Sequence, residues 1–319
     1  MDQEKTIRED LSAMEDSIRT RSSSGGFTPG LARSFQKFLM AFYSVCGRDL
    51  PWRRTTDPYR ILVSEFMLQQ TQVERVSTKY KEFLGRFPDV AALARAPRNE
   101  VLLAWQGLGY NRRALALHET ARRVMDEFHG SIPLDRTILD SFPGIGKATA
   151  GAILVFSTNR PGIFIETNIR RVYIHLFFTD AAKVHDREIE PLLGKTLLKK
   201  RPREFYYALM DYGSALKKGT GDPNGSALKK GSGDLNGSHL KRGKRNPNTR
   251  SASYSRQSPF EGSDRQVRGM ILRYLLAEGE VREEDLTGLV PVEPGRLERI
   301  LGDLEREGFL ERSGNRIRC

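Results

Sequence analysis

Two glutamates in this sequence have surroundings that could give them opposite roles in acid–base chemistry. Glu65 lies in the segment SEFMLQQTQV, where helical spacing places it on one face with Ile61, Leu62 and Leu68. An apolar setting disfavours the charged form, so we expect a raised pKa and a protonated carboxyl group near neutrality. A carboxylic acid in this state can donate a proton as a general acid.

Glu166 stands in the segment IFIETNIRRV, after three apolar residues and at the start of a helical pattern. The helix macrodipole favours a charged carboxylate there by roughly 0.3 to 1 kcal/mol, so Glu166 is expected to be ionised. An acid and an anion together are what cleavage of a glycosidic bond requires, one to protonate the leaving group and one to stabilise the oxocarbenium-like sugar. Taken alone, each motif also fits a structural glutamate near a helix N-terminus.

Three glutamines, Gln69, Gln70 and Gln72, follow the first glutamate closely. Their amides could fill a gap in a stack of bases or read the edge of a base. The alternative is an ordinary solvated face of the same helix.

The segment FPGIGKATA at residues 142–150 predicts a tight turn between two helices. Gly144 and Gly146 leave the turn bare of side chains, and the helix after it directs free backbone N–H groups outward. Such a turn, with Lys147 beside it, can bind a phosphate without any base contact. The alternative is an ordinary glycine-rich helix connection.

The elements that must position these residues are helices. From residue 31 to residue 212 apolar residues recur at helical spacing, as in Phe35, Phe38 and Phe42. Prolines interrupt the pattern often enough to leave helices of ordinary length, at Pro51, Pro88, Pro97, Pro133, Pro143 and Pro161. The sequence therefore predicts an all-α domain over residues 31–212, preceded by a flexible polar leader at residues 1–30.

A 12-residue repeat follows this domain. Its three copies, GSALKKGTGDPN, GSALKKGSGDLN and GSHLKRGKRNPN, occupy residues 213–248 of a basic linker that we place at residues 213–263. With a single leucine in each copy the repeat has too little apolar surface to stack, so we expect a solvated, flexible segment.

The last region, residues 264–319, predicts three helices and a hairpin around Ser-Gly-Asn, which is the element order of a winged-helix domain. This region carries a net charge of −2, whereas residues 27–212 carry +9 and residues 213–256 carry +8 of the total of +12. The positive charge favours a polyanionic partner for the central domain. The acidic C-terminal region fits a protein contact or a structural cap at least as well as DNA binding.

The cellular location is predicted from absences. No apolar run approaches the roughly 18 residues that span a bilayer, and the N-terminus carries no apolar signal core. We expect a cytoplasmic protein that associates with the nucleoid and not with a membrane.

The sequence resembles the helix-hairpin-helix (HhH-GPD) superfamily of DNA glycosylases, and within it the MutY-like branch of A/G-specific adenine glycosylases. The resemblance covers roughly residues 35–212 and rests on five motifs that occur in the family's order and spacing. They are LPWRRTTDPYRILVSEFMLQQTQV at 50–73, WQGLGY at 105–110, FPGIGKATA at 142–150, IETNIRRV at 165–172 and YYALMDYG at 206–213. The resemblance implies a two-lobed, all-α fold with a cleft into which a nucleotide is flipped.

The resemblance also implies roles for individual residues. Glu65 matches the catalytic glutamate of the family, Asn168 its active-site asparagine, and Gln70 a glutamine that probes the base stack. Tyr110 and Asn111 stand where the family has a pair of tyrosines that wedge against the opposite base. The residues expected to bind DNA are Gln69, Gln70, Gln72, Tyr110, Asn111, Gly144, Gly146, Lys147, Arg170, Lys217 and Lys218.

The sequence departs from the family pattern at two positions near this chemistry. The catalytic aspartate of the family is Glu166 here, one methylene longer. Ala148 stands where bifunctional relatives such as endonuclease III carry the lyase lysine, and where adenine-specific members carry Tyr or Ser. A glycosylase without strand-cleaving lyase activity is therefore expected.

The chain also departs from its relatives in cofactors and accessory domains. Its only cysteines are Cys46 and Cys319, so the four-cysteine iron–sulfur cluster of many relatives is not expected, and neither is another metal site. The one ion that we leave open is a monovalent cation at the hairpin. The basic repeat stands where the cluster loop would be, and either replaces its contact with the DNA backbone or is an expansion in a tolerant loop. No counterpart of the Nudix-like domain that inspects 8-oxoguanine follows.

These features together predict a monofunctional DNA glycosylase of base excision repair, which acts on a flipped, mispaired base in double-stranded DNA. Adenine opposite 8-oxoguanine or guanine is the expected substrate. Two alternatives stay open. One is excision of thymine or uracil from mismatches, because Ala148 and Glu166 reshape the base pocket. The other is a catalytically silent protein that binds DNA structures, with a C-terminal domain that contacts another protein.

Overall fold

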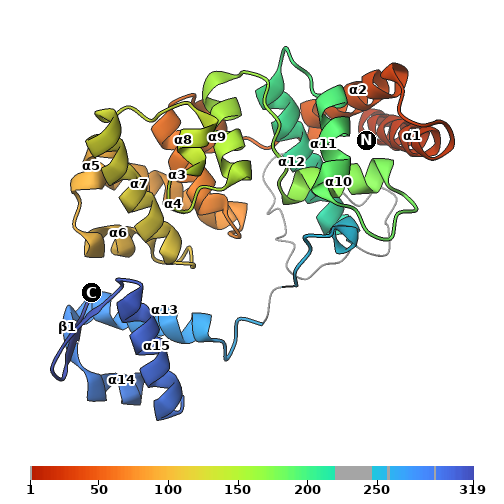
Figure 1. Cartoon of the computed structure of the whole chain (residues 1–319). Coiled ribbons are helices and arrows are strands. Elements are labelled where there is room, and N and C mark those ends of the chain that lie inside the picture. The colour runs from red at the N-terminus through yellow and green to blue at the C-terminus, as the bar shows by residue number, and fades with distance from the viewer. Residues whose placement is uncertain (1, 220–245, 257–258, 291) are drawn as a thin grey trace. The chain divides into compact units, whose positions relative to one another are not determined.

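The computed structural model describes residues 2–219, 246–256, 259–290 and 292–319 (Figure 1). In this part the regular secondary structure is helical apart from one small sheet and an isolated bridge, which confirms the expected all-α class. The chain divides into two compact units. The first comprises residues 1–56, 135–140 and 145–255, and the second comprises residues 57–134, 141–144 and 256–319.

The first unit is built around α10, which packs against α1, α11, α12 and the short helix η3. Its elements are α1 (Asp2–Gly25), α2 (Pro29–Cys46), η1 (Pro51–Arg54), α8 (Arg136–Asp140), α9 (Lys147–Thr158), α10 (Thr167–Phe177), α11 (Asp186–Thr196), α12 (Pro202–Gly219) and η3 (Pro247–Arg250). Phe35 of α2 meets the rings of Tyr173 and Phe177 of α10 and of Phe205 of α12 edge to face. This aromatic cluster fixes α10, whose N-terminus carries Glu166.

The predicted flexible leader is wrong for most of its length, because residues 2–25 form helix α1. Leu11 and Ile18 lie seven residues apart on one face and are buried against the helices that α1 contacts, α2 and α10. Glu15 lies between them and is also buried, with its Oε1 2.6 Å from Nε2 of His175. The overall polarity of this segment hid a narrow apolar stripe, which is sufficient for a helix that packs on one side only.

The predicted linker begins and ends differently from the expectation. Helix α12 continues through the first seven residues of the repeat and ends at Gly219, with Leu216 buried. At the other end, η3 packs against α10. Residues 220–245, which hold most of the repeat, lie outside the described residues, as does the side chain of Lys218.

The second unit contains five helices from the central region and the C-terminal elements. These are α3 (Pro58–Leu68), α4 (Val73–Arg86), α5 (Val90–Arg95), α6 (Arg98–Trp105), α7 (Arg112–Phe128), α13 (Asp264–Glu278), β1 (Glu280–Arg282), α14 (Glu283–Leu289), α15 (Pro294–Arg306), β2 (Glu311–Ser313) and β3 (Arg316–Arg318). The order of three helices and a hairpin is confirmed, and a short strand that was not predicted, β1, adds to the hairpin. The antiparallel sheet has the order β1-β3-β2, with Val281 opposite Ile317.

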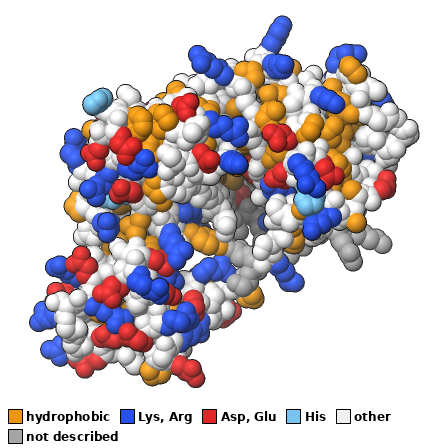
Figure 2. Space-filling model, in the orientation of Figure 1, with side chains coloured by type: hydrophobic (Ala, Val, Ile, Leu, Met, Phe, Trp, Pro, Cys, Tyr) orange, Lys and Arg blue, Asp and Glu red, His pale blue; other side chains and the backbone are white. Residues whose placement is uncertain are grey.

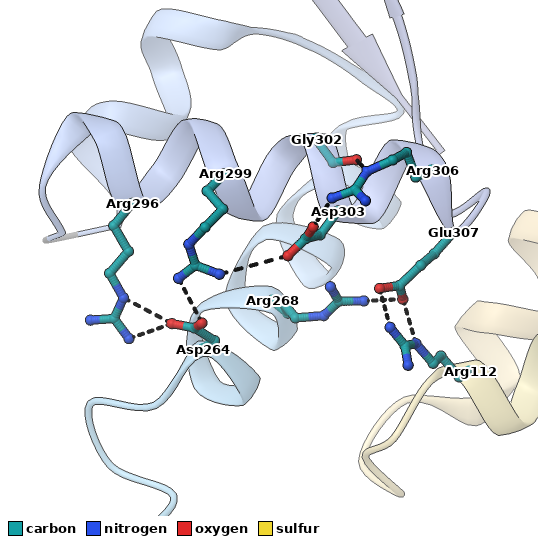
Figure 3. A network of polar contacts seen from close by, with 9 residues as sticks. All are labelled: Arg112, Asp264, Arg268, Arg296, Arg299, Gly302, Asp303, Arg306 and Glu307. Carbon is teal, nitrogen blue, oxygen red and sulfur yellow. Dashed lines mark hydrogen bonds and ion pairs between the residues drawn. The ribbon is translucent and has the colours of Figure 1, made fainter.

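Opposite charges are interspersed over the surface of the C-terminal elements (Figure 2). On α15, Arg296 and Arg299 both bind Asp264 of α13, at 2.6 and 2.8 Å, and Arg306 pairs with Asp303 (Figure 3). Glu307, just after α15, pairs with Arg268 and Arg112. The arginines of α15 are therefore already matched by carboxylates.

None of the helices in the described part of the chain is long and apolar enough to cross a membrane.

Candidate functional site

Glu166 is the N-cap of α10, as the sequence predicts. Its Oε1 accepts hydrogen bonds from the backbone N–H groups of Asn168, at 2.7 Å, and Ile169, at 2.9 Å, and its Oε2 accepts one from Nδ2 of Asn168, at 3.3 Å. These are the second and third residues of the helix, the groups that a capping side chain ordinarily satisfies. The longer glutamate side chain thus folds back and performs the capping that a shorter acid would perform.

Asn168 is held from its other side by Arg171, a residue that the sequence analysis did not single out. The guanidinium of Arg171 is buried, and its Nη1 donates to Oδ1 of Asn168, at 2.7 Å, and to the carbonyl oxygen of Gly213, at 2.6 Å. A Cβ at Gly213 would lie 2.5 Å from the carbonyl oxygen of Asn168, so only glycine lets α12 approach this closely. The second arginine of IRRV and the glycine of MDYG were the available signals.

Two further basic residues of this unit that were expected to bind DNA are partly buried. Arg170 makes a two-point ion pair with Asp186, at 2.6 and 2.7 Å, and this pair raises the pKa of Arg170. Lys217 lies half-buried in the last turns of α12. The role of both residues in DNA binding stays a prediction.

Glu65 lies half-buried in α3, in the second unit. Of the residues expected on its face, Ile61 and Leu62 are buried and Leu68 is half-buried, which agrees with the apolar setting that the sequence predicts. The raised pKa and the acid role of Glu65 stay predictions.

The helix that carries Glu65 ends at Leu68, earlier than the pattern indicates. Gln69 is its C-cap, Gln70 adopts a left-handed conformation with φ +56°, and Gln72 is the N-cap of the next helix. The three glutamines therefore do not share a helix face. They form the turn between α3 and α4, in which Gln70 is exposed and Gln69 donates from Nε2 to the carbonyl oxygen of Gly144, at 3.0 Å.

Arg113 explains why the helix ends there, and the sequence analysis missed it. This buried guanidinium donates to the carbonyl oxygens of Phe66, at 2.8 Å, and Met67, at 3.0 Å, which lie in the last turn of α3. It also donates to Oγ1 of Thr71, at 2.9 Å, and to the carbonyl oxygen of Gly109, at 2.8 Å. One side chain thus joins the turn of Gln70 to the loop before Tyr110, and its burial among uncharged acceptors lowers its pKa to about 10.

Tyr110 and Asn111 lie in that second loop, immediately before α7. Tyr110 is also left-handed, with φ +49°, and 37% of its surface is exposed. Its hydroxyl accepts a hydrogen bond from Arg265, at 2.8 Å, and Asn111 is the N-cap of α7. Gln70 and Tyr110, the two side chains predicted to enter the base stack, therefore both belong to residues with a strained backbone. Arg113 binds the loops that contain them.

The predicted hairpin is confirmed as a turn between α8 and α9, but its two glycines differ. Gly144 has φ +77°, and a Cβ there would lie 2.8 Å from Cε1 of Phe66. Gly146 is the N-cap of α9 with φ −102°, and nothing lies within 4 Å of a Cβ placed there. Lys147 is exposed in the first turn of α9, and Ala148 is half-buried. Gly144 is thus required for packing, whereas Gly146 leaves the helix N-terminus open.

The sequence has two cysteines, Cys46 and Cys319, whereas a four-cysteine cluster needs four. That the protein carries no such cluster stays a prediction. Among the described residues no group of three or more His, Cys, Asp and Glu side chains is arranged to hold a metal ion.

Comparisons with known proteins agree with the motifs. Residues 63–196 match the HhH-GPD superfamily of base excision DNA repair proteins. The adenine DNA glycosylase of Mycobacterium tuberculosis (strain ATCC 25618 / H37Rv) is 32% identical over 280 residues, which cover 86% of this chain and 90% of that protein. This chain belongs to the HhH-GPD superfamily, in its adenine DNA glycosylase branch. The resemblance of the sequence to that branch is thereby confirmed.

Other members of the superfamily match a shorter part of the chain. The adenine DNA glycosylase of Buchnera aphidicola subsp. Baizongia pistaciae is 37% identical over 187 residues, and the match spans about half of that relative, 52%. A thymine/uracil-DNA glycosylase of Pyrobaculum aerophilum is 32% identical over 186 residues, covering 56% of this chain and 80% of that protein. Among solved structures, a thermostable thymine-DNA glycosylase matches with a TM-score of 0.51 and 26% identity, over 57% of this chain and 85% of that one.

Proposed function

We propose that this protein is a monofunctional DNA glycosylase that removes adenine from mispairs with 8-oxoguanine or guanine. The observation that carries the proposal is the length of its similarity to an adenine DNA glycosylase. That match covers 280 residues, far beyond the 134 residues from 63 to 196 that define the superfamily, whereas the thymine/uracil relative aligns over 186 residues.

In the proposed reaction Glu65 protonates the departing base and Glu166 stabilises the positive charge that develops on the sugar. The surroundings of Glu166 support the second role. Three N–H donors fix both of its oxygens in place, so the carboxylate needs little reorganisation as charge develops. Asn168 has its own partners on both sides, and we assign it to the positioning of Glu166.

The substrate that we propose is double-stranded DNA with a mispaired base. The exposed N-terminus of α9, with Gly146 and Lys147, would bind a backbone phosphate. Gln70 and Tyr110 would enter the base stack when the target nucleotide leaves it. The excess of basic residues between 27 and 256 would hold the DNA, and binding should weaken as salt is raised. In the cell we place the protein on nucleoid DNA.

Strand cleavage by a Schiff base is not part of the proposal, because Ala148 occupies the position of the lyase lysine. Borohydride trapping should give no covalent complex with DNA, and strand breaks should appear only after alkali. A trapped complex would refute this part of the proposal.

Excision of thymine or uracil is the second candidate. The match to the thymine/uracil-DNA glycosylase of Pyrobaculum aerophilum favours it, since that alignment covers 80% of the relative at 32% identity. A silent DNA binder predicts mismatch binding without any abasic product. For the C-terminal elements we propose a contact with protein, because carboxylates already neutralise the arginines of α15.

The test is a panel of duplexes with A:8-oxoG, A:G, T:G, U:G and matched pairs, cleaved by alkali after incubation with wild type, Glu65→Gln and Glu166→Gln. We expect the adenine duplexes to be cleaved by the wild type and both variants to lose at least about a hundredfold in rate. Product only from T:G or U:G would favour the second candidate. Product that survives Glu65→Gln would refute the acid assignment, and no product from any duplex would favour the silent binder.

A further inference from the structure

Five residues at the end of the repeat and just after it bind both ends of the helix that Glu166 caps. This segment, Asn246–Arg250, comprises η3 and the residue before it, and it lies in the same unit as α10. Pro247 and Asn248 are buried, so the segment is part of the packed interior of this unit. The segment is also held by Val184, whose backbone N–H donates to the carbonyl oxygen of Arg250, at 2.8 Å.

At the N-terminal end of α10 the segment reaches the turn that holds Glu166. Nδ2 of Asn248 donates to the carbonyl oxygen of Thr167, the residue immediately after Glu166, at 2.9 Å. Oδ1 of Asn246 accepts from Nε of Arg171, at 3.1 Å. Because Arg171 in turn holds Asn168, both asparagines act on the residues that surround the carboxylate of Glu166.

At the C-terminal end the same segment binds one carbonyl group in the last turn of α10, which a helix leaves without a partner, and three in the loop after it. The guanidinium of Arg250 donates to the carbonyl oxygens of Ile174, at 3.1 Å, Thr179, at 2.9 Å, and Ala181, at 3.2 Å, and also to that of Phe178. A segment bound at both ends of one helix resists rotation and sliding of that helix better than a single contact would.

The two asparagines use different atoms of their side-chain amides, Oδ1 in Asn246 and Nδ2 in Asn248. Asn246 serves as an acceptor, toward Arg171 and the backbone N–H of Asn248. Asn248 serves as a donor, and its Oδ1 is buried without a hydrogen-bond partner among the described residues. A carboxylate can replace the first side chain but not the second, and this difference separates a specific role from general packing.

We propose that Asn246 and Asn248 are positioning residues, which hold the Glu166–Asn168 turn in its catalytic geometry through Arg171 and Thr167. The inference rests on the proposed glycosylase function. The three copies of the repeat end in Asp-Pro-Asn at 222–224, Asp-Leu-Asn at 234–236 and Asn-Pro-Asn at 246–248. Only the last three residues of the third copy are described, and they bind α10, whereas the first copy is described as far as Gly219 and the second lies outside the described residues.

The experiment compares two substitutions that change the net charge equally, Asn246→Asp and Asn248→Asp, with Asn246→Leu and Asn248→Ala. Single-turnover excision is measured on the duplex that the wild type cleaves fastest, and enzyme titration separates the saturating rate from the half-saturating concentration. We expect Asn248→Asp, Asn248→Ala and Asn246→Leu to lower the saturating rate at least about tenfold, since a displaced catalytic group loses rate steeply, and Asn246→Asp to stay within about threefold of wild type. Deletion of residues 225–236 should keep the saturating rate, because it leaves the third copy in place.

A second measurement does not depend on activity. Hydrogen–deuterium exchange of the amides at residues 167–172 should be faster in Asn248→Asp and Asn246→Leu and unchanged in Asn246→Asp. Equal rates and equal exchange in all variants would overturn the inference, as would an Asn246→Asp protein that is as slow as Asn246→Leu. A wild type that excises no base refutes the proposed function. In that case the exchange rates at residues 167–172 alone decide whether Asn246 and Asn248 hold this turn in place.

Discussion

Arg113 is the residue that best explains how two exposed residues, Gln70 and Tyr110, keep a strained backbone conformation. Gln70 and Tyr110 both adopt left-handed backbone conformations, which cost a non-glycine residue about 1 kcal/mol or more each. The hydrogen bonds of Arg113 to Thr71 in one loop and to Gly109 in the other stabilise these conformations.

Replacement of Arg113 should therefore impair both stability and activity. Arg113→Met leaves several buried carbonyl groups without donors, and we expect a loss of about 3 kcal/mol in the free energy of unfolding. Arg113→Lys keeps the charge but cannot reach both loops at once, so the fold should persist while the excision rate falls about tenfold or more. Urea denaturation and single-turnover rates measure the two effects. A wild-type rate in Arg113→Lys would show that the bridge between the loops does not matter.

Glu166 shows what a sequence can and cannot give at the scale of one residue. Its place at the start of a helix follows from the helical pattern that begins after it and was predicted correctly. Arg171 lies in the helix that Glu166 caps, whereas Gly213 and Asn246, which contact the same turn, come from distant parts of the chain. The motifs IRRV and MDYG contain Arg171 and Gly213, but only the three-dimensional contacts show what these residues hold.

At the scale of the element, the two glycines of the hairpin give a matched pair of substitutions. Gly144→Ala meets both a positive φ and the ring of Phe66, so we expect a loss of about 2 kcal/mol or more in stability. Gly146→Ala has open space around the added methyl group and should leave stability nearly unchanged. If a DNA phosphate approaches the N-terminus of α9, this second variant should bind duplex DNA several-fold more weakly. Unchanged affinity in Gly146→Ala would place the phosphate elsewhere.

Helix α1 is the element that the sequence predicted least well. Ile18 is almost fully buried, so Ile18→Ala should lower the free energy of unfolding by about 3 kcal/mol. Ser17→Ala, at an exposed neighbouring position, is the control and should change stability little. Equal stability of the two variants would mean that α1 does not pack as described.

The central helices were predictable because their apolar residues recur regularly and prolines separate them. The exceptions have physical reasons. The apolar stripe on α1 is narrow, with Leu11 and Ile18 as its buried hydrophobic residues among those described. Helix α3 ends early because Arg113 donates hydrogen bonds to carbonyl groups in its last turn. Strand β1 is three residues long and is stabilised by pairing with β3. The end of the third repeat copy folds because α10 offers partners to it, which the composition of the repeat does not reveal.

At the scale of the whole molecule, Asp211 joins the motif MDYG to the motif LPWRR. Its buried carboxylate accepts from Nε of Arg48, at 2.6 Å, and from Nη1 and Nη2 of Arg53, both at 2.8 Å. Burial alone would raise the pKa of Asp211, but the hydrogen bonds from Arg53 and the charges of Arg48 and Arg53 hold it below its ordinary value.

This ion pair should make stability depend on acid pH. Because the pKa of Asp211 is lower in the folded state, its contribution is complete above the ordinary value of 3.8 and is lost as pH falls through the lowered value. Asp211→Asn leaves the buried Arg53 without its countercharge, so we expect a loss of about 3 to 5 kcal/mol at pH 7. The difference between wild type and variant should shrink below pH 3.8 in denaturation experiments. A difference that stays constant with pH would contradict the account.

Net charge differs between the parts of the chain. The excess of basic residues lies between 27 and 256, whereas the C-terminal elements, residues 264–319, carry −2. In α15, the helix that a winged-helix domain would use to read DNA, the arginines are paired with Asp264 and Asp303. The central residues, for which we propose DNA binding, and the C-terminal elements, for which we propose a contact with protein, thus differ in net charge.

The most direct test of the central claim is identification of the base that the full chain releases. The protein is incubated in excess with an equimolar mixture of A:8-oxoG and T:G duplexes, and the free bases are quantified by mass spectrometry. We predict that adenine is released much faster than thymine, and that Glu65→Gln releases neither. Release of thymine in preference to adenine, or of adenine by Glu65→Gln at the wild-type rate, would contradict the account.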